Sequence, residues 1–550
     1  MIIFELFIFL VSIIFFSCIL SGYGSLISGR NLNNFFEEIF LGFLIISLIT
    51  TFIHFFLKID LIISGIIFLI GFIFFLKKKD FFNISRLNKF YYYFFLVIFL
   101  IPMFISQKYH EDFGYYHLPY SLAFLADKIV FGFANIDRPY VYNSIWLNIN
   151  SIFFLKNDNF NFQTLPSFLL FLNFILFSVN KVIEKKQIQL SDYYLTIVVF
   201  YFLLKFTRIS EFGVDFPSTI FSILSIFYFI KFYETNKDFE KKNYFYLNLS
   251  FALFSILIKL SALPILILAS FLYFSNFQIF KTHILKYKFL MVYFLCLIFF
   301  IQQFIFTGCI LFPTSFTCLD VSWFSNDHLN VSKQLELINK SYSEANNIYS
   351  REEFLSNFTW FSFWFKRNLI EITEHTLTIL LPILTLTLFF EKGKNRDNHL
   401  LFKIKKILYL FIIISFIFWL SFSPVVRFAI FIFVTFIFLI ISNIFFSKIF
   451  SKKKFIVFIF IFLTFNFSKN ILRINQTEEL FLGIKKIDNK FVLKKQISNT
   501  FVNIYQPDIN NNKKNGWQGR LCWETPFICS YNNLDVYKKY GYLIINKLEN

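Results

Sequence analysis

The chain begins with an apolar run, MIIFELFIFLVSIIFFSCIL (Met1–Leu20), in which Glu5 is the one charged residue. The run has the length and composition of a membrane-spanning helix. The run could also be a secretory signal peptide, but such a peptide carries positive charge before its apolar part. Here the first basic residue is Arg30, which follows the run. We therefore expect a retained span whose N-terminus lies outside.

Apolar runs of this kind recur along most of the chain. A span needs about 20 apolar residues, and the candidates lie at 3–21, 39–57, 61–76, 90–106, 165–181, 191–206, 216–233, 244–259, 262–278, 288–306, 370–390, 406–422, 427–446 and 454–469. Lys259 and Pro264 interrupt the sequence between the eighth and ninth candidates. These runs predict an all-α polytopic membrane protein with a bundle of about 14 (12–14) transmembrane helices.

The composition supports a membrane protein and gives little support to a nucleic-acid partner. The 550 residues are 57% hydrophobic and only 16% charged, whereas soluble domains have about 25% charged residues. The net charge is +19, but Lys and Arg lie in short clusters between apolar runs, where the positive-inside rule places them. The seven histidines are scattered, so we expect no metal site.

The basic clusters also set the orientation. They lie at 77–89, 181–186, 231–242, 281–288, 392–406 and 448–454. With fourteen spans, all of them fall on one face, which must be cytoplasmic. The opposite face then holds the loops 107–164, 207–215 and 307–369. We expect a transmembrane domain over 1–469 and a small external α+β tail over 470–550.

Four of the six cysteines form two close pairs on the face expected to be external. They are Cys309 and Cys318, and Cys522 and Cys529. Disulfides form and persist outside the cytoplasm, so these residues are candidates for two bridges. Four cysteines allow three pairings, and local bridges and bridges between loop and tail both stay open. Free thiols are the alternative, and the spacing disfavours zinc.

The stretch KYHEDFGYYHLPY (Lys108–Tyr120) gathers carboxylates, imidazoles and phenols in an otherwise apolar region. Asp112 follows the end of a span, and Tyr116 and His117 come shortly after it. The next residues, LPYSLAFLADKIVFGF, carry apolar side chains at helical spacing, which predicts an amphipathic helix in the membrane interface. Asp112 would then lie at the membrane–water boundary. An ordinary charge flanking a span is the alternative.

Three further charged residues are expected at the same level. Asp215 opens one span, Lys259 ends another, and Arg427 lies in a turn too short to be a solvated loop. A buried guanidinium is costly unless it meets an anion, and its planar fork suits phosphate oxygens. Carboxylates and cations at the lipid boundary suit a lipid-phosphate-linked substrate. Each cation could instead snorkel to the interface.

The arrangement resembles the GT-C class of integral-membrane glycosyltransferases, such as protein O-mannosyltransferases and the aminoarabinose transferases of lipid A. There, an Asp-Glu-x-x-Tyr motif opens the first large external loop, and an interfacial helix follows. Asp112 and Tyr116 match this motif, and Phe113 stands where the Glu would be. Glu111 or Asp215 could supply the second carboxylate.

A closer resemblance is to uncharacterised bacterial GT-C-like membrane proteins with an Asp-x-x-x-Tyr-His-Leu-Pro motif. DFGYYHLP, which begins at Asp112, is similar to that motif. Later fragments follow the same order: KLSALP at Lys259, TGCILFP with Trp323 beyond it, SPVVRF at Arg427, and CWETPFIC in the tail. The resemblance therefore covers most of the chain through short motifs.

The resemblance implies a substrate and a location. The donor would be a sugar on a polyprenyl phosphate, and the product would have inverted stereochemistry. The acceptor would be a glycan, a lipid or a protein. We expect the site and the C-terminus to face the periplasm or exterior of a bacterial inner membrane. No cofactor is expected beyond the lipid-linked co-substrate and the surrounding membrane lipids, and a divalent metal stays open.

The resemblance also implies roles for single residues. Asp112 would be the general base, while Arg427 and Lys259 would balance the charge of the leaving phosphate. Tyr116 and His117 would orient the carboxylate or bind sugar hydroxyls, although His117 could equally pack at a helix start.

Trp323 is a candidate to stack on a sugar face, with the aromatic belt of the interface as the alternative.

Two other functions stay open from the sequence. An O-antigen polymerase or ligase would rely on arginines in a large external loop, and the loop 307–369 has Arg351 and Arg367 but no clear Arg-rich motif. A transporter or flippase would favour repeated halves and charges in mid-span, and neither is visible.

Overall fold

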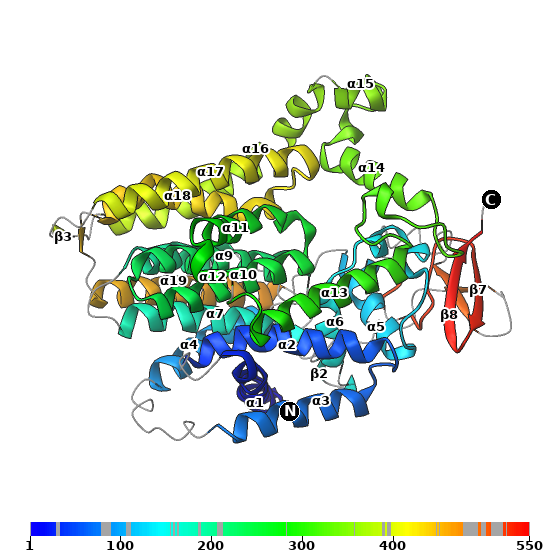
Figure 1. Ribbon diagram of the computed structural model, residues 1–550, viewed down its shortest axis with the longest axis horizontal. Helices are drawn as coiled ribbons and strands as arrows, with labels where there is room; N and C mark the ends of the chain where they lie inside the picture. The colour runs from blue at the N-terminus through cyan, green and yellow to red at the C-terminus, as the bar shows by residue number, and fades with distance from the viewer. Residues whose placement is uncertain are drawn as a thin grey trace.

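The computed structural model describes residues 2–28, 34–78, 90–105, 112–154, 156–157, 160–161, 164–184, 189–205, 213–281, 283–356, 358–387, 391–392, 398–446, 448–449, 452–476, 493–496, 502–507, 521–523 and 525–548. These residues form a mainly helical bundle, with a β-hairpin near the C-terminus at one end (Figure 1). We call this end the hairpin end and the opposite end the far end.

Seven helices in the described residues are long and apolar enough to cross a membrane. They are α1 (Ile2–Ser28), α2 (Phe35–His54), α7 (Leu165–Glu184), α9 (Asp215–Glu234), α13 (Tyr287–Thr307), α17 (Asn398–Phe422) and α19 (Lys452–Gln476). Four shorter apolar segments accompany them: α3 (Leu61–Leu76), α4 (Phe90–Ile105), η6 with α11 (Leu260–Ile265 and Leu266–Ser275), and η9 with α18 (Val426–Ala429 and Ile430–Phe446). The chain is therefore a multi-spanning membrane protein by length and composition of its helices.

The expectation of about 14 transmembrane helices is not met by the described residues. Three predicted spans correspond to α8 (Leu190–Lys205), α10 (Asp238–Ile258) and α16 (Thr359–Thr387), which are not among the seven long apolar helices. Every residue of α8 from Leu190 to Leu203 is buried inside the protein. α8 is only 16 residues long, and α10 and α16 contain several charged residues, so the sequence overcounted the spans.

The remaining elements connect the helices or form their ends. In chain order they are η2 (Phe113–His117), α5 (Leu118–Ala126), η3 (Phe133–Asn135), η4 (Arg138–Val141), α6 (Ile145–Ile152), β1 (Lys156–Asn157), β2 (Phe160–Asn161), α12 (Phe277–Phe280), η7 (Ser315–Thr317), α14 (Asp327–Asn339), η8 (Tyr342–Glu344), α15 (Arg351–Ser356), β3 (Glu391–Lys392) and β4 (Lys448–Ile449).

Glycines let α1 pack closely against α2 and α3. A Cβ at Gly24 would lie 1.7 Å from the carbonyl oxygen of Glu38, and one at Gly42 would lie 2.0 Å from that of Leu20. Small residues let helix backbones approach in the same way at other membrane interfaces. The first three helices therefore form one packed layer, along the lower edge of Figure 1.

A chain of buried side-chain hydrogen bonds joins the segment after Asp112 to the bundle. The Tyr120 hydroxyl lies 2.9 Å from the Oδ1 atoms of both Asn143 and Asn148, which share its one proton. The amide groups of Asn143 and Asn148 in turn donate to Oε1 of Gln302 in α13, at 3.0 and 2.9 Å. Buried polar groups need such partners, so this chain fixes α5 and α6 against α13.

The predicted interfacial helix is shorter and more buried than the sequence suggested. The chain forms a π-turn over η2 and then α5, which ends at Ala126. Leu118, Tyr120 and Phe124 are buried, with at most 1% exposed. The expected membrane-facing side of α5 is covered by protein, so the prediction of an amphipathic helix lying in the interface is wrong.

The tail beyond Gln476 contains strands and no helix among its described residues, whereas an α+β tail was expected. β5 (Leu493–Gln496) pairs with β6 (Ile504–Pro507), and β7 (Leu534–Lys539) pairs with β8 (Tyr542–Lys547), both antiparallel. Ile545 N–H donates to the Phe131 carbonyl at 2.9 Å, and Phe131 N–H donates to the Leu543 carbonyl. The tail is thereby docked on the chain that follows α5.

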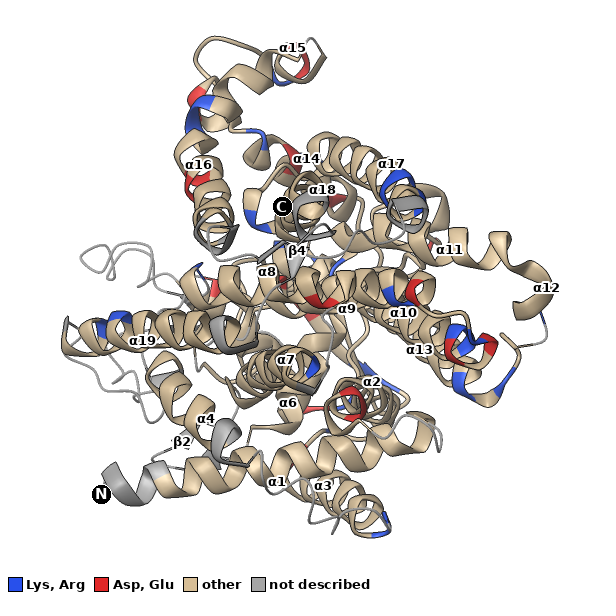
Figure 2. Ribbon diagram, turned by 90° about the vertical axis from the view of Figure 1, so that its left-hand side faces the viewer, with Lys and Arg blue, Asp and Glu red and all other residues tan. Residues whose placement is uncertain are grey.

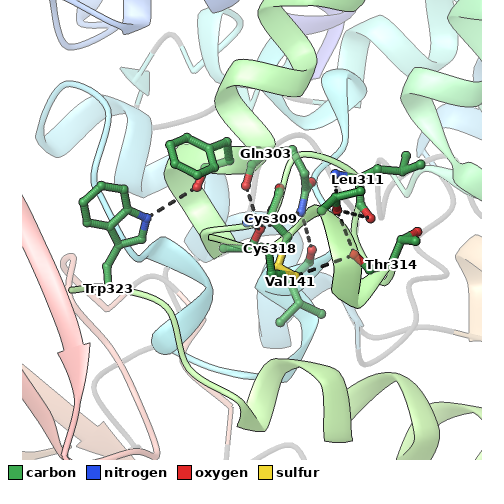
Figure 3. The surroundings of a disulfide bond; sticks show 10 residues. Val141, Gln303, Cys309, Leu311, Thr314, Cys318 and Trp323 are labelled. Carbon is green, nitrogen blue, oxygen red and sulfur yellow. Dashed lines mark hydrogen bonds between the residues drawn. A yellow bond between two sulfur atoms is a disulfide. The ribbon is translucent and has the colours of Figure 1, made fainter. Parts of the chain in front are cut away.

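Two local disulfides are present, Cys309–Cys318 and Cys522–Cys529. Figure 3 shows the first, beside the Gln303 side chain, whose Nε2 donates to the Val141 carbonyl at 2.9 Å. Cys18 and Cys296 are free thiols.

Candidate functional site

Four charged side chains that the sequence singled out lie together. The Arg427 guanidinium contacts two carboxylates: its Nε lies 2.7 Å from Oδ2 of Asp215, and an Nη lies 3.7 Å from Oδ2 of Asp112. Lys259 forms an ion pair with the other oxygen of Asp215. Two negative and two positive groups thus form a balanced cluster, which we call the Arg427 cluster.

Each member of the Arg427 cluster stands where a helix starts or breaks. Asp112 precedes η2, and Asp215 is the first residue of α9. Lys259 interrupts the helix after α10 in an extended conformation, with φ −152° and ψ 121°. Arg427 lies in the short helix η9. Irregular backbone at such breaks lets the charged side chains converge instead of pointing into lipid.

Aromatic side chains support the cations and their turn. Lys259 Nζ lies 3.0 Å from the centre of the Phe428 ring, a cation–π contact that also offsets the cost of burying the ammonium. The indole N–H of Trp419 donates to the Val425 carbonyl at 2.8 Å, and that of Trp364 donates to the Pro424 carbonyl. These bonds anchor the turn that presents Arg427.

A cavity of about 1230 Å³ begins at the Arg427 cluster. Asp215 and Arg427 line it, together with side chains from α8, α9, α16, α18 and α19. Its apolar wall includes Leu377, Leu381, Ile461 and Phe465. The cavity therefore combines charged groups with a surface suited to hydrocarbon.

A second polar group lies in the same cavity, on α8 and α16. The Tyr201 hydroxyl and Nδ1 of His375 are 2.7 Å apart, and Nε2 of His375 lies 3.7 Å from Glu371. Lys205 forms an ion pair with Glu374. This group was missed from the sequence, because 370–390 was assigned as an apolar span although it contains Glu371, Glu374 and His375.

Two more cations of the cavity come from α19. Lys469 and Arg473 are four residues apart, so they share one helix face, and both line the cavity. Lys469 Nζ donates to the Leu204 carbonyl, and an Nη of Arg473 donates to Oδ1 of Asn470 at 3.3 Å. In the sequence, the signal for these cations was a pair of basic residues, four positions apart, at the end of the last apolar run.

The structure does not bring the other predicted site residues to the cavity as a group. His117 is buried, with 3% exposed, and packs edge-on against the Tyr116 ring at 4.3 Å. Glu111 lies outside the described residues. Trp323 does not line the cavity: its indole packs edge-on against Phe131 at 4.9 Å and donates to the Phe304 carbonyl at 3.4 Å (Figure 3). The structure therefore gives Trp323 a packing position outside the cavity.

Three groups in the segments between the spans have pKa values shifted by burial. Tyr115, three residues after Asp112, hydrogen-bonds to the carboxyl of Asp137. Burial raises the pKa of Asp137 above its usual range, and burial also raises that of Tyr115. Further along the chain, burial lowers the pKa of His328 to about 4.

The tail supplies a residue that sequence reasoning did not place at the site. Trp523 lies against Phe113 and Gly114, directly after Asp112, and its backbone N–H donates to the Gly114 carbonyl at 2.9 Å. The fragment CWETPFIC was noted in the sequence, but nothing in its pattern indicates which segment it contacts.

Among the described residues, no group of three or more His, Cys, Asp or Glu side chains is arranged to hold a metal ion. No curated protein and no solved structure matches the chain. A family model does match it, over residues 2–434, a range that includes all four members of the Arg427 cluster. The chain therefore belongs to the family described as a domain of unknown function, DUF8201.

Proposed function

We propose that the chain is a membrane glycosyltransferase that moves a sugar from a polyprenyl-phosphate-linked donor to an acceptor, with Asp112 as general base. One observation carries the proposal. Asp112 and Asp215, which are far apart in sequence, meet at one guanidinium beside a 1230 Å³ cavity that has both charged and apolar walls.

Asp112 suits the role of base because it is held and still accessible. Its side chain is 30% exposed, and the contact with Arg427 fixes its direction. In the reaction, an acceptor hydroxyl or amine gives its proton to Asp112 and attacks the anomeric carbon. The bond from that carbon to the phosphate oxygen breaks, and the phosphate leaves with the electron pair. Attack opposite the leaving group inverts the configuration.

The cations of the Arg427 cluster suit a phosphate leaving group, and one of them, Arg427, lines the cavity. Arg427 and Lys259 are held by Asp215 in the Arg427 cluster. Fixed positive groups stabilise charge that develops in a transition state, because they need no reorganisation at that moment. Lys469 and Arg473 add two positive groups to the same cavity.

The apolar wall suits the lipid part of the donor. Leu377 and Leu381 of α16 and Ile461 and Phe465 of α19 line the cavity and are also 47–56% exposed at the surface of the bundle. In a membrane, that surface meets hydrocarbon. α16 and α19 flank α8 in Figure 2, so a lipid chain could extend sideways between them.

The proposed location is the external face of a bacterial inner membrane. Two observations support it: the basic clusters between spans, which favour a cytoplasmic far end, and the two disulfides in the loop and the tail. The acceptor would then be a glycan, lipid or protein on the external side.

The test is the fate of the lipid-linked sugar in cells that lack the gene. We expect a polyprenyl-phosphate-linked sugar to accumulate and to be consumed again when the wild-type chain is restored. Asp112→Asn should fail to consume it while reaching normal amounts in the membrane. Asp320→Asn, which changes an exposed carboxylate outside the cavity, is the control.

Normal consumption by Asp112→Asn would refute the general base. Accumulation of the lipid-linked sugar only on the cytoplasmic side would instead favour a flippase over a transferase.

A further inference from the structure

The loop closed by the Cys522–Cys529 disulfide packs on the turn that begins at Asp112. Trp523 N–H donates to the Gly114 carbonyl at 2.9 Å, and its indole lies edge-on to the Phe113 ring at 6.0 Å. Trp523 is buried, with 7% exposed. A residue late in the chain thus covers the backbone next to the proposed base.

The π-turn leaves the Gly114 carbonyl without its regular partner. In η2, Leu118 N–H donates to the Phe113 carbonyl, five residues back. The same pattern would pair the Gly114 carbonyl with residue 119, which is proline and has no N–H. A buried carbonyl needs a donor, and the backbone of Trp523 supplies it.

Because residue 114 is glycine, the Trp523 indole can lie directly against it, and a side chain at this position would collide with the ring. A Cβ at Gly114 would lie 2.5 Å from Cδ2 of Trp523 and 2.7 Å from two further indole atoms. These three are the nearest contacts that such a Cβ would meet, and all belong to the ring. The glycine and the tryptophan therefore form a matched pair.

Trp523 is itself held by the loop around it. Its φ is 45°, in the left-handed region that side chains rarely adopt, so the surroundings must maintain it. Thr525 N–H donates to the Cys522 carbonyl at 3.0 Å, and Cys522 is bonded to Cys529. The Ser530 hydroxyl donates to the Ile136 carbonyl at 2.6 Å, which ties the loop to the segment after α5.

We propose that Trp523 is a positioning residue for Asp112: the disulfide-closed loop Cys522–Cys529 holds Trp523 on Gly114 and thereby fixes the π-turn that directs Asp112 toward Arg427. The consequence for turnover rests on the proposed function. The contact itself does not, so the two can be tested separately.

The contact is tested by hydrogen exchange on the full chain in lipid nanodiscs. In Trp523→Ala, amides of the peptide 112–118 should exchange at least about tenfold faster, because the ring no longer covers the turn. Cys522→Ser with Cys529→Ser should act in the same direction. The matched control is Cys309→Ser with Cys318→Ser, which removes the other disulfide and should leave 112–118 unchanged. Unchanged exchange in both Trp523→Ala and the Cys522/Cys529 variant would overturn the proposal.

Turnover is tested with the polyprenyl-phosphate-linked sugar extracted from cells that lack the gene. Gly114→Ala and Trp523→Ala should each lower kcat at least about tenfold, with KM for the extracted lipid within threefold of wild type, because the base is misdirected while the cavity is intact. The double variant should be no worse than Trp523→Ala alone, because the added methyl then has no ring to meet. Trp523→Phe should recover part of the rate.

Effects of Gly114→Ala and Trp523→Ala that multiply in the double variant would overturn the positioning role, as would a rise in KM with kcat unchanged. If exchange at 112–118 responds as expected but Asp112→Asn still consumes the extracted lipid, the proposed function fails and the contact stands.

Discussion

Two ion-pair clusters lie at opposite ends of α9. At the far end, Lys231 of α9 pairs with Glu234 at 3.1 Å and lies 3.9 Å from Asp192, and these side chains are at most 8% exposed. Figure 2 shows charged residues at the helix ends there. The Arg427 cluster has two cations for its two carboxylates, its side chains are 18–34% exposed, and two of them line the cavity.

The difference separates charges that hold the fold from charges that can meet a substrate. The far-end cluster is closed by further hydrogen bonds, such as that from Ser191 Oγ to Glu234 at 2.7 Å. Removing one partner of a closed pair leaves a buried charge without compensation. In the Arg427 cluster, exposure and the cavity leave room for a ligand to share the cations.

The largest expected effect is on stability at the far end. Lys231→Ala should lower the free energy of unfolding by about 3–5 kcal/mol, because the charges of Asp192 and Glu234 lose their buried partner. The measurement is thermal or denaturant unfolding in nanodiscs. Lys237→Ala is the matched control, since Lys237 also pairs with a Glu three residues on at 3.1 Å but is 78% exposed; it should change little. Equal losses of unfolding free energy in both variants would contradict the view that the buried far-end cluster holds the fold.

The next effect is on turnover at the Arg427 cluster. Arg427→Ala should reduce transfer by about 100–1000-fold, the usual result of removing a group that stabilises developing negative charge. Thermal unfolding should change less than in Lys231→Ala. Arg427→Lys should recover little of the transfer activity, because a single ammonium group cannot contact both carboxylates as the planar guanidinium does. Full activity of Arg427→Lys would argue that only the charge matters.

A third effect depends on pH and lies in the loop between α13 and α16. Burial lowers the pKa of His328 to about 4 from a usual value near 6.5, and its Nε2 lies 2.9 Å from Oδ1 of Asn135. Because the folded form binds the proton less readily, the stabilisation is complete above pH 6.5 and is lost as pH falls toward 4. The loss is at most about 3 kcal/mol. Hydrogen exchange of 326–340 at pH 7 and pH 5 measures it, and His328→Gln should remove the difference.

The smallest effect concerns the cations of α19. Lys469→Ala and Arg473→Ala should each raise KM for the lipid-linked donor about tenfold with kcat nearly unchanged, because they would contact the donor equally before and during transfer. Lys237→Ala again serves as control. A fall in kcat with constant KM would place these residues in the reacting centre instead.

The sequence predicted part of the fold and part of the candidate site for identifiable reasons. Apolar runs and their basic flanks are local patterns, so a multi-spanning helical protein followed from them. Asp112, Asp215, Lys259 and Arg427 stood out because a charge beside an apolar run is costly to bury unless it meets an opposite charge, and the structure brings these four together. Their chemical roles stay predictions.

Other parts could not be read in this way. The buried face of α5 has the same apolar spacing that a lipid-facing helix would have, so the interfacial helix was wrong. Apolar runs also occur in helices that are too short or too charged to be counted as spans, such as α8 and α16, so the number of spans was overestimated. The strands of the tail lie in mixed, polar sequence without clear alternation, so their positions could not be predicted, and the described part of the tail beyond Gln476 contains strands alone.

The sequence by itself determined that many segments are apolar enough for a membrane, which segments lie between them, and which charged residues are candidates for the site. These properties depend on the composition of short windows. Only the tertiary structure decided that one arginine serves two carboxylates, that α16 and α19 wall a cavity, and that Trp523 covers Gly114. These contacts join residues as much as about 400 positions apart, and their energy depends on burial and direction, which no local pattern encodes.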